Sequence, residues 1–151
     1  RVARCSWPVD FVVRAIQETG WSGFSVNDAL TPLANMGQTL FDPPDVSGWE
    51  TGPSWFSSGR TLARMNFGSQ LSVNQRQNLR NDARPHAGTA RSTLSYMLDR
   101  LSPMRYEDGP QNELLGYLES GGAWTGSDAQ LLVKVPGLAH LILGSSEYQF
   151  V

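Results

Sequence analysis

MGQTLFDPPDVSGWETGPSWFSSGRTLARMNF, residues 36–67, joins the end of one helix, a long aromatic loop and the start of a second helix. Gly37 is a typical helix stop, and the pair Pro43-Pro44 restricts the residues before it to extended geometry. A serine at position 57 or 58 can cap the helix that follows. The stretch therefore predicts two helices joined by a rigid loop, residues 37–57, that lacks regular secondary structure.

Apolar residues recur at helical spacing along most of the remaining chain, and no segment shows the sustained period-two alternation of a β-strand. Helices are expected over residues 6–20, where Ser6 is the candidate cap and Gly20 the candidate stop, and over 25–37, 89–102 and 110–119. A last apolar segment begins with Ser127 as its candidate helix cap, and Pro136 is expected to start a second helical piece within it. The fold class is therefore all-α: an irregular helical bundle with a long ordered loop rich in Pro, Gly and Trp.

The 151 residues fit one helical domain, 1–151, or the C-terminal portion of a larger helical protein. A start at Arg1 without an apolar signal region favours the second of these expectations. Residues 72–88 are rich in Asn, Gln, Arg and Asp, with Val73 and Leu79 as their large apolar side chains. Such a composition buries little surface, which predicts a polar linker or mobile excursion.

Charge and composition exclude several classes of protein. The net charge is −2, and the basic residues are dispersed among carboxylates, so nucleic acid is not an expected partner. No apolar run approaches the roughly 20 residues that cross a bilayer, so no transmembrane segment is predicted. The single cysteine, Cys5, excludes an internal disulfide and leaves the compartment open.

Trp49 and Trp55 are the most prominent candidate binding residues, because each places a large apolar ring on the loop. Two functions are open to them: stacking on sugar rings, or gripping a partner peptide. A structural role is the favoured alternative, in which both rings fold back as a lid over the helices. We expect Trp49 to be largely buried in that arrangement.

Arg60 and Arg64 lie one helical turn apart, so both guanidinium groups project from one side of the helix after the loop. Together with Gln38 and Asn66 they would form an anion- or peptide-binding cluster if the loop folded over them. The favoured alternative is structural, with Arg64 donating hydrogen bonds to loop carbonyls that have no other partner.

No residue pattern specifies a reaction, and we assign no catalytic residue and no cofactor. Asp42, Asp45 and Glu50 are close in sequence but do not follow a calcium-loop order, so no metal site is predicted. His86 and His140 have no acid or nucleophile at motif spacing, and the chain lacks a G-x-S-x-G sequence.

Four motifs in order, SWPVDFVVRAIQETG, MGQTLFDPPDVSGW with a second tryptophan beyond it, TLARMNF and LAHLILGSSEYQF, resemble the C-terminal part of the bacterial domain-of-unknown-function 1800 family. The resemblance implies a larger N-terminal helical portion, export to the periplasm or cell surface, and genes beside secreted sulfatase- or phosphatase-like proteins. It implies no reaction. The motif positions are Gln38, Leu40, Pro43, Pro44, Gly48, Trp49, Trp55, Arg64, Asn66, His140, Glu147 and Tyr148.

Three functions follow as hypotheses. The leading one is a non-catalytic structural or protein-interaction module of an exported bacterial protein, whose partner is another protein or the rest of its own chain. The second is part of an enzyme acting on envelope polymers, to which Arg64, Asn66 and His140 would contribute. The third is a carbohydrate-binding surface for an envelope polysaccharide, formed by Trp49 and Trp55.

Overall fold

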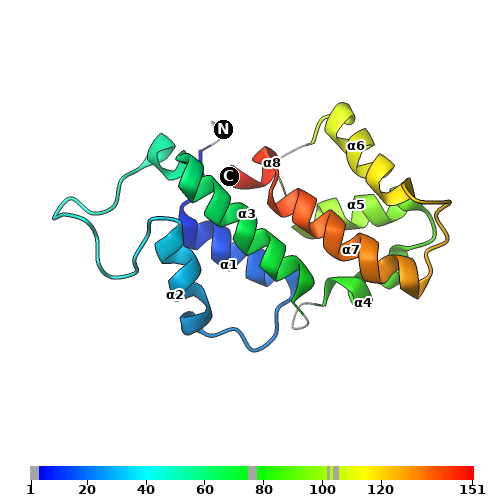
Figure 1. Ribbon diagram of the computed structural model, residues 1–151, viewed down its shortest axis with the longest axis horizontal. Helices are drawn as coiled ribbons and strands as arrows, with labels where there is room; N and C mark the ends of the chain where they lie inside the picture. The colour runs from blue at the N-terminus through cyan, green and yellow to red at the C-terminus, as the bar shows by residue number, and fades with distance from the viewer. Residues whose placement is uncertain (1–3, 75–77, 102, 104–105) are drawn as a thin grey trace.

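The computed structural model describes residues 4–74, 78–101, 103 and 106–151, and within them the chain is helical with no β-strand (Figure 1). The predicted all-α fold class is confirmed. The helices are α1 (Pro8–Thr19), α2 (Val26–Asn35), α3 (Ser58–Val73), α4 (Leu79–Ala83), α5 (Ala90–Leu101), α6 (Asp108–Glu119), α7 (Asp128–Leu143) and α8 (Ser146–Gln149), with short 3-10 turns η1 (Gly52–Phe56) and η2 (Arg84–His86).

Helix α7 is the centre of the bundle and contacts α3, α4, α5, α6 and α8 (Figure 1). Ser127 caps it as predicted, accepting the Gln130 N–H at 3.3 Å. The prediction that Pro136 starts a separate helical piece is wrong, because α7 runs through Pro136 without a break. A proline inside a helix costs about 3 kcal/mol. The complete burial of Val135 and Leu138 on either side of it explains why the helix continues.

The segment 72–88, for which a polar linker or mobile excursion was predicted, contains the end of α3 together with α4 and η2. Residues 75–77 lie outside the described part. Leu79 and Ala83 are fully buried, and α4 packs on α7. Leu79 and Ala83 are enough to stabilise this short helix because α7 provides an apolar surface for them to pack on. The composition of the segment alone does not show that such a surface is present.

The two ends of the described chain pair with one another. Arg4 and Val151 exchange both backbone hydrogen bonds at 3.0 and 2.9 Å, and the Ser6 N–H donates to the Gln149 carbonyl at 2.9 Å. This antiparallel contact lies beside the start of α3, so residues from both ends reach one buried region.

The loop between α2 and α3 leaves the bundle and extends away from it (Figure 1). Residues 41–47 are all exposed, including Phe41 at 91% and Val46 at full exposure. We call residues 39–51 the arm. Its tip is shaped by two turns, in which Asp42 N–H donates to the Thr39 carbonyl at 3.2 Å and Gly48 N–H to the Asp45 carbonyl at 3.1 Å.

Candidate functional site

Arg64 is 1% exposed and ties the two ends of the chain to α3. Its Nη2 donates to the Ser6 carbonyl at 2.6 Å, and its Nη1 donates to the Ser6 hydroxyl at 3.1 Å and to Gln149 Oε1 at 3.2 Å. The prediction that Arg64 donates to loop carbonyls is therefore corrected. The reason is geometric: the paired ends, far away in sequence, supply the carbonyls that reach its side of α3.

The buried guanidinium of Arg64 is surrounded by neutral oxygens and aromatic rings. Besides three oxygens, its guanidinium carbon lies 5.2 Å from the Phe11 ring centroid and 5.6 Å from that of Phe56. Burial lowers the pKa of Arg64, yet a guanidinium stays charged in a protein. Because its side chain is 1% exposed and donates to oxygens from both ends of the described chain, Arg64 acts as a structural connector.

Arg60 takes the role that was expected of Arg64. Its Nη1 donates to the Ser54 carbonyl at 2.6 Å and pairs with the Glu50 carboxylate at 3.4 Å, while its guanidinium lies 5.4 Å from the Trp55 ring centroid. Gly37 allows this approach, because a Cβ there would meet Arg60 Nε at 2.5 Å. The base of the arm is therefore held to the first turn of α3.

Gln38 is 2% exposed and accepts the Val9 backbone N–H at 2.9 Å. It thereby supplies the acceptor for the first turn of α1. Ser6, the predicted cap, instead donates its hydroxyl to the Gln149 carbonyl at 2.9 Å. The glutamine can take the place of a local serine cap because the C-terminal end of α2 lies beside the start of α1. The sequence pattern does not indicate this proximity.

The two loop tryptophans have different surroundings. Trp55 is 1% exposed, with its ring 6.4 Å from that of Trp7. Trp49 is only half-buried and lines a shallow cavity of about 310 Å³ within the arm, together with Pro44 and Glu50. The expectation that both rings form a lid over the helices therefore describes Trp55 and does not describe Trp49.

Asn66 is exposed on α3 and faces a groove of about 460 Å³ between α2 and α3, away from Arg64. The structure thus does not gather Gln38, Trp49, Trp55, Arg64 and Asn66 into one pocket. Gln38, Trp55 and Arg64 are buried connectors, whereas Trp49 and Asn66 are accessible at separate places.

His140 is half-buried at the rim of a cleft of about 740 Å³ between α4 and α7, which we call the α4–α7 cleft. Arg80 of α4 also lines it. Leu132 and Val133 of α7 are 56% and 64% exposed there. The cleft was not predicted, although α7 carries apolar residues on every side, which signals a helix with more apolar surface than one core needs.

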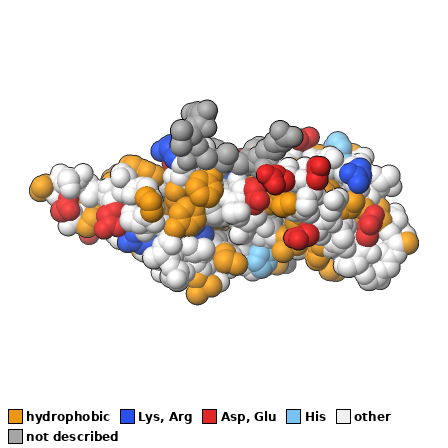
Figure 2. Space-filling model, turned by 90° about the horizontal axis from the view of Figure 1, so that it is seen from above, with side chains coloured by type: hydrophobic (Ala, Val, Ile, Leu, Met, Phe, Trp, Pro, Cys, Tyr) orange, Lys and Arg blue, Asp and Glu red, His pale blue; other side chains and the backbone are white. Residues whose placement is uncertain are grey.

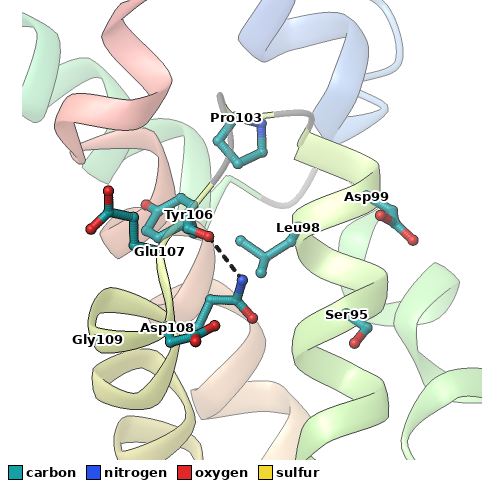
Figure 3. Close-up of a pocket in the computed structure, with 9 residues that line it drawn as sticks. Ser95, Leu98, Asp99, Pro103, Tyr106, Glu107, Asp108 and Gly109 are labelled. Atoms are coloured by element: carbon teal, nitrogen blue, oxygen red, sulfur yellow. Dashed lines mark hydrogen bonds between the residues drawn. The ribbon is translucent and has the colours of Figure 1, made fainter.

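A larger hollow of about 1140 Å³ lies between α5 and α6 (Figure 3). Asp99, Glu107 and Asp108 line it, and Gln111 Nε2 donates to the Tyr106 carbonyl at 3.0 Å. Burial raises the pKa of Tyr106 to about 12. In the described part of the chain no three His, Cys, Asp or Glu residues are placed to hold a metal ion.

A buried polar group joins α1 to α8. Tyr148, fully buried, donates its hydroxyl to Glu18 Oε2 at 2.6 Å, and the Arg14 guanidinium lies 3.9 Å from its ring centroid. Burial raises the pKa of Glu18, against the opposing effects of the Tyr148 hydrogen bond and of Arg14. Burial also raises the pKa of Tyr148. The group therefore joins α1 to α8 through side-chain contacts, with Glu18 and Arg14 partly exposed at 17% and 20%.

The model of a family described as "Protein of unknown function (DUF1800)" matches residues 3–150. The chain belongs to the DUF1800 family. No curated protein and no solved structure matches it.

Some of the residues that carry the resemblance to the DUF1800 family have structural roles in this chain. Of its motif positions, Gln38, Trp55, Arg64 and Tyr148 are buried in contacts that join distant elements. None of the helices in the described ranges has both the length and the apolar character needed to cross a bilayer.

Proposed function

We propose that this DUF1800 chain is a non-catalytic interaction module of an exported bacterial protein, and that its arm binds a protein partner. The observation that carries the proposal is the exposure of Phe41, 91%, and Val46, fully exposed, at the tip of a segment that leaves the bundle. Large apolar side chains at such a tip gain free energy only when another surface covers them, at about 25 cal/mol per Å² of apolar surface buried.

The base of the arm supports this role because it is attached at several points. Arg60 holds Ser54 and Glu50, and Gln38 connects the preceding residues to α1. At the tip, Ser47 N–H donates to the Asp45 carboxylate at 2.7 Å. A segment held in one shape loses less conformational entropy on binding, which favours affinity.

The chemistry of the tip indicates the kind of partner. Hydrophobic and acidic side chains gather at the narrow left end of the molecule in Figure 2, where the arm lies. Its acidic residues are Asp42, Asp45 and Glu50, and no basic residue occurs between Gln38 and Gly59. The expected partner therefore presents an apolar pocket with a basic rim.

The two alternative functions have less support. The enzyme alternative needs Arg64, Asn66 and His140 to act together, but Arg64 is buried and the other two face different clefts. The carbohydrate alternative retains only Trp49 as an accessible ring, because Trp55 is 1% exposed.

Site-specific photo-crosslinking tests the proposal. A benzophenone amino acid is placed at position 41 or 46 in the full-length protein, expressed in the bacterium that encodes it. Position 62 is the matched control, because Leu62 is also an exposed apolar residue, 57%, but lies on α3. We expect a discrete crosslinked protein from positions 41 and 46. Equal crosslinking from position 62, or none from the arm, would contradict the proposal.

A further inference from the structure

We propose that the partner of the arm is a second copy of this chain, and that the arm of one copy docks into the α4–α7 cleft of the next. The proposal rests on the proposed function of the arm and adds the identity of its binding surface. It is drawn from the match between two surfaces of one chain in apolar character, in charge and in position.

The apolar part of the match lies in the α4–α7 cleft. Its volume, about 740 Å³, falls within the range of roughly 300–1,000 Å³ that is usual for ligand pockets and is large enough for an aromatic side chain. Val73, Leu132 and Val133 line it and are 71%, 56% and 64% exposed. Phe41 and Val46 are the most exposed large apolar side chains in the described chain.

The charges are complementary. Arg80 gives the α4–α7 cleft a positive charge, and none of the described residues that line it is acidic. The arm carries Asp42 and Asp45 beside its two apolar residues. Hydrogen bonds from the Ser47 side chain and backbone lower the pKa of Asp45, so this carboxylate keeps its charge in mildly acidic solution.

The other large hollow does not suit the arm. Three carboxylates, those of Asp99, Glu107 and Asp108, line the cleft between α5 and α6. Like charges placed against one another at an interface oppose binding by that surface. Charge therefore selects the α4–α7 cleft over the larger one.

The positions of the two surfaces require a second molecule. The arm extends from one end of the bundle, whereas α4 lies toward the other end (Figure 1). A contact between two different surfaces of identical copies is head-to-tail, so copies add one after another until a ring closes or a filament grows.

The test is sedimentation velocity of the full-length protein over a range of concentrations. The arm variant is Phe41→Ser with Val46→Ser, and the cleft variant is Arg80→Glu with Val133→Glu. Leu62→Ser is the matched control for removal of an exposed apolar residue from another face. Circular dichroism establishes that each variant is folded.

We expect the parent and the Leu62→Ser variant to form concentration-dependent oligomers, and each double variant alone to associate at least tenfold more weakly. Mixing the two double variants is the decisive step, because the mixture retains one intact arm and one intact cleft. It should give a one-to-one dimer and nothing larger.

A parent that stays monomeric, or a mixture of the two double variants that forms no dimer, would overturn the second-copy inference. In the first case, a crosslink from position 41 to a different protein would leave the proposed function intact. Absence of any crosslink from the arm would instead remove the proposed function itself, so the two failures are distinguishable.

Discussion

Arg64 Nη2 lies 2.6 Å from the carbonyl oxygen of Ser6, a residue 58 positions earlier in the chain. The same guanidinium donates to the side chain of Gln149 at 3.2 Å. One side chain of α3 therefore holds both ends of the described chain. The buried amide of Gln149 is in turn oriented by its own donation to the Leu143 carbonyl at 2.8 Å.

We expect Arg64→Lys to lower the free energy of unfolding by roughly 1–3 kcal/mol, the usual cost of leaving buried polar groups unsatisfied. Lysine keeps the charge but cannot reach the carbonyl of Ser6 and Gln149 with a planar fork. Urea denaturation measures the change. Arg60→Lys is the control, since that side chain is 30% exposed and should cost less. Equal midpoints for the two variants would contradict the connector role.

Gln38→Ala should destabilise the protein by about 0.5–2 kcal/mol, the range found when a helix loses its N-terminal capping acceptor. The Val9 N–H would then lack the oxygen that now lies 2.9 Å away. Thermal unfolding followed by circular dichroism is the measurement. Thr39→Ala, at an exposed neighbouring position, should leave the transition unchanged. If both variants melt like the parent, Gln38 does not serve α1.

The two loop tryptophans should respond differently to truncation. Trp55→Ala is expected to cost about 3–5 kcal/mol, as large aromatic truncations in cores do. Trp49→Ala should cost roughly half of that or less, because its ring is half-buried and packs within the arm. Guanidinium chloride denaturation of both variants gives the comparison, and a larger loss for Trp49→Ala would reverse the assignment.

Glu18 should make stability depend on pH in the acidic range. Burial raises its pKa above the unfolded value of about 4.5, so its protonated form is favoured in the folded state. The contribution of Glu18 is therefore greatest below the unfolded pKa and is lost as pH rises through the folded pKa.

The measurement is the free energy of unfolding at several pH values between 3.5 and 7, for the parent and for Glu18→Gln. We expect the parent to lose stability relative to the variant as pH rises through this window, because glutamine still offers an oxygen to the Tyr148 hydroxyl and does not ionise. A difference that is constant with pH would show that Glu18 titrates normally.

The sequence pattern was sufficient to predict helix stops, helix caps and the positions of several helices. The predicted stop at Gly20 is confirmed, with a φ of 70° at that residue, and so are the caps at Ser57 and Ser127. The helices predicted over 89–102 and 110–119 appear as α5 and α6. Period and turn residues predict such features because the interactions that cause them span only a few residues.

Tertiary contacts determined the hydrogen-bond partners of the buried polar side chains and the extent of two helices, α4 and α7. Sequence spacing placed Arg60 and Arg64 on one side of α3. It could not show that Arg60 contacts the loop while Arg64 contacts the two ends of the described chain. The continuity of α7 through Pro136, and the folding of Leu79 and Ala83 into α4, depend on surfaces that distant segments supply. The sequence alone determined the all-α class and the family. Which polar side chains are buried, and which apolar ones stay exposed on the arm and in the α4–α7 cleft, followed only from packing, because burial is a property of the whole assembled chain.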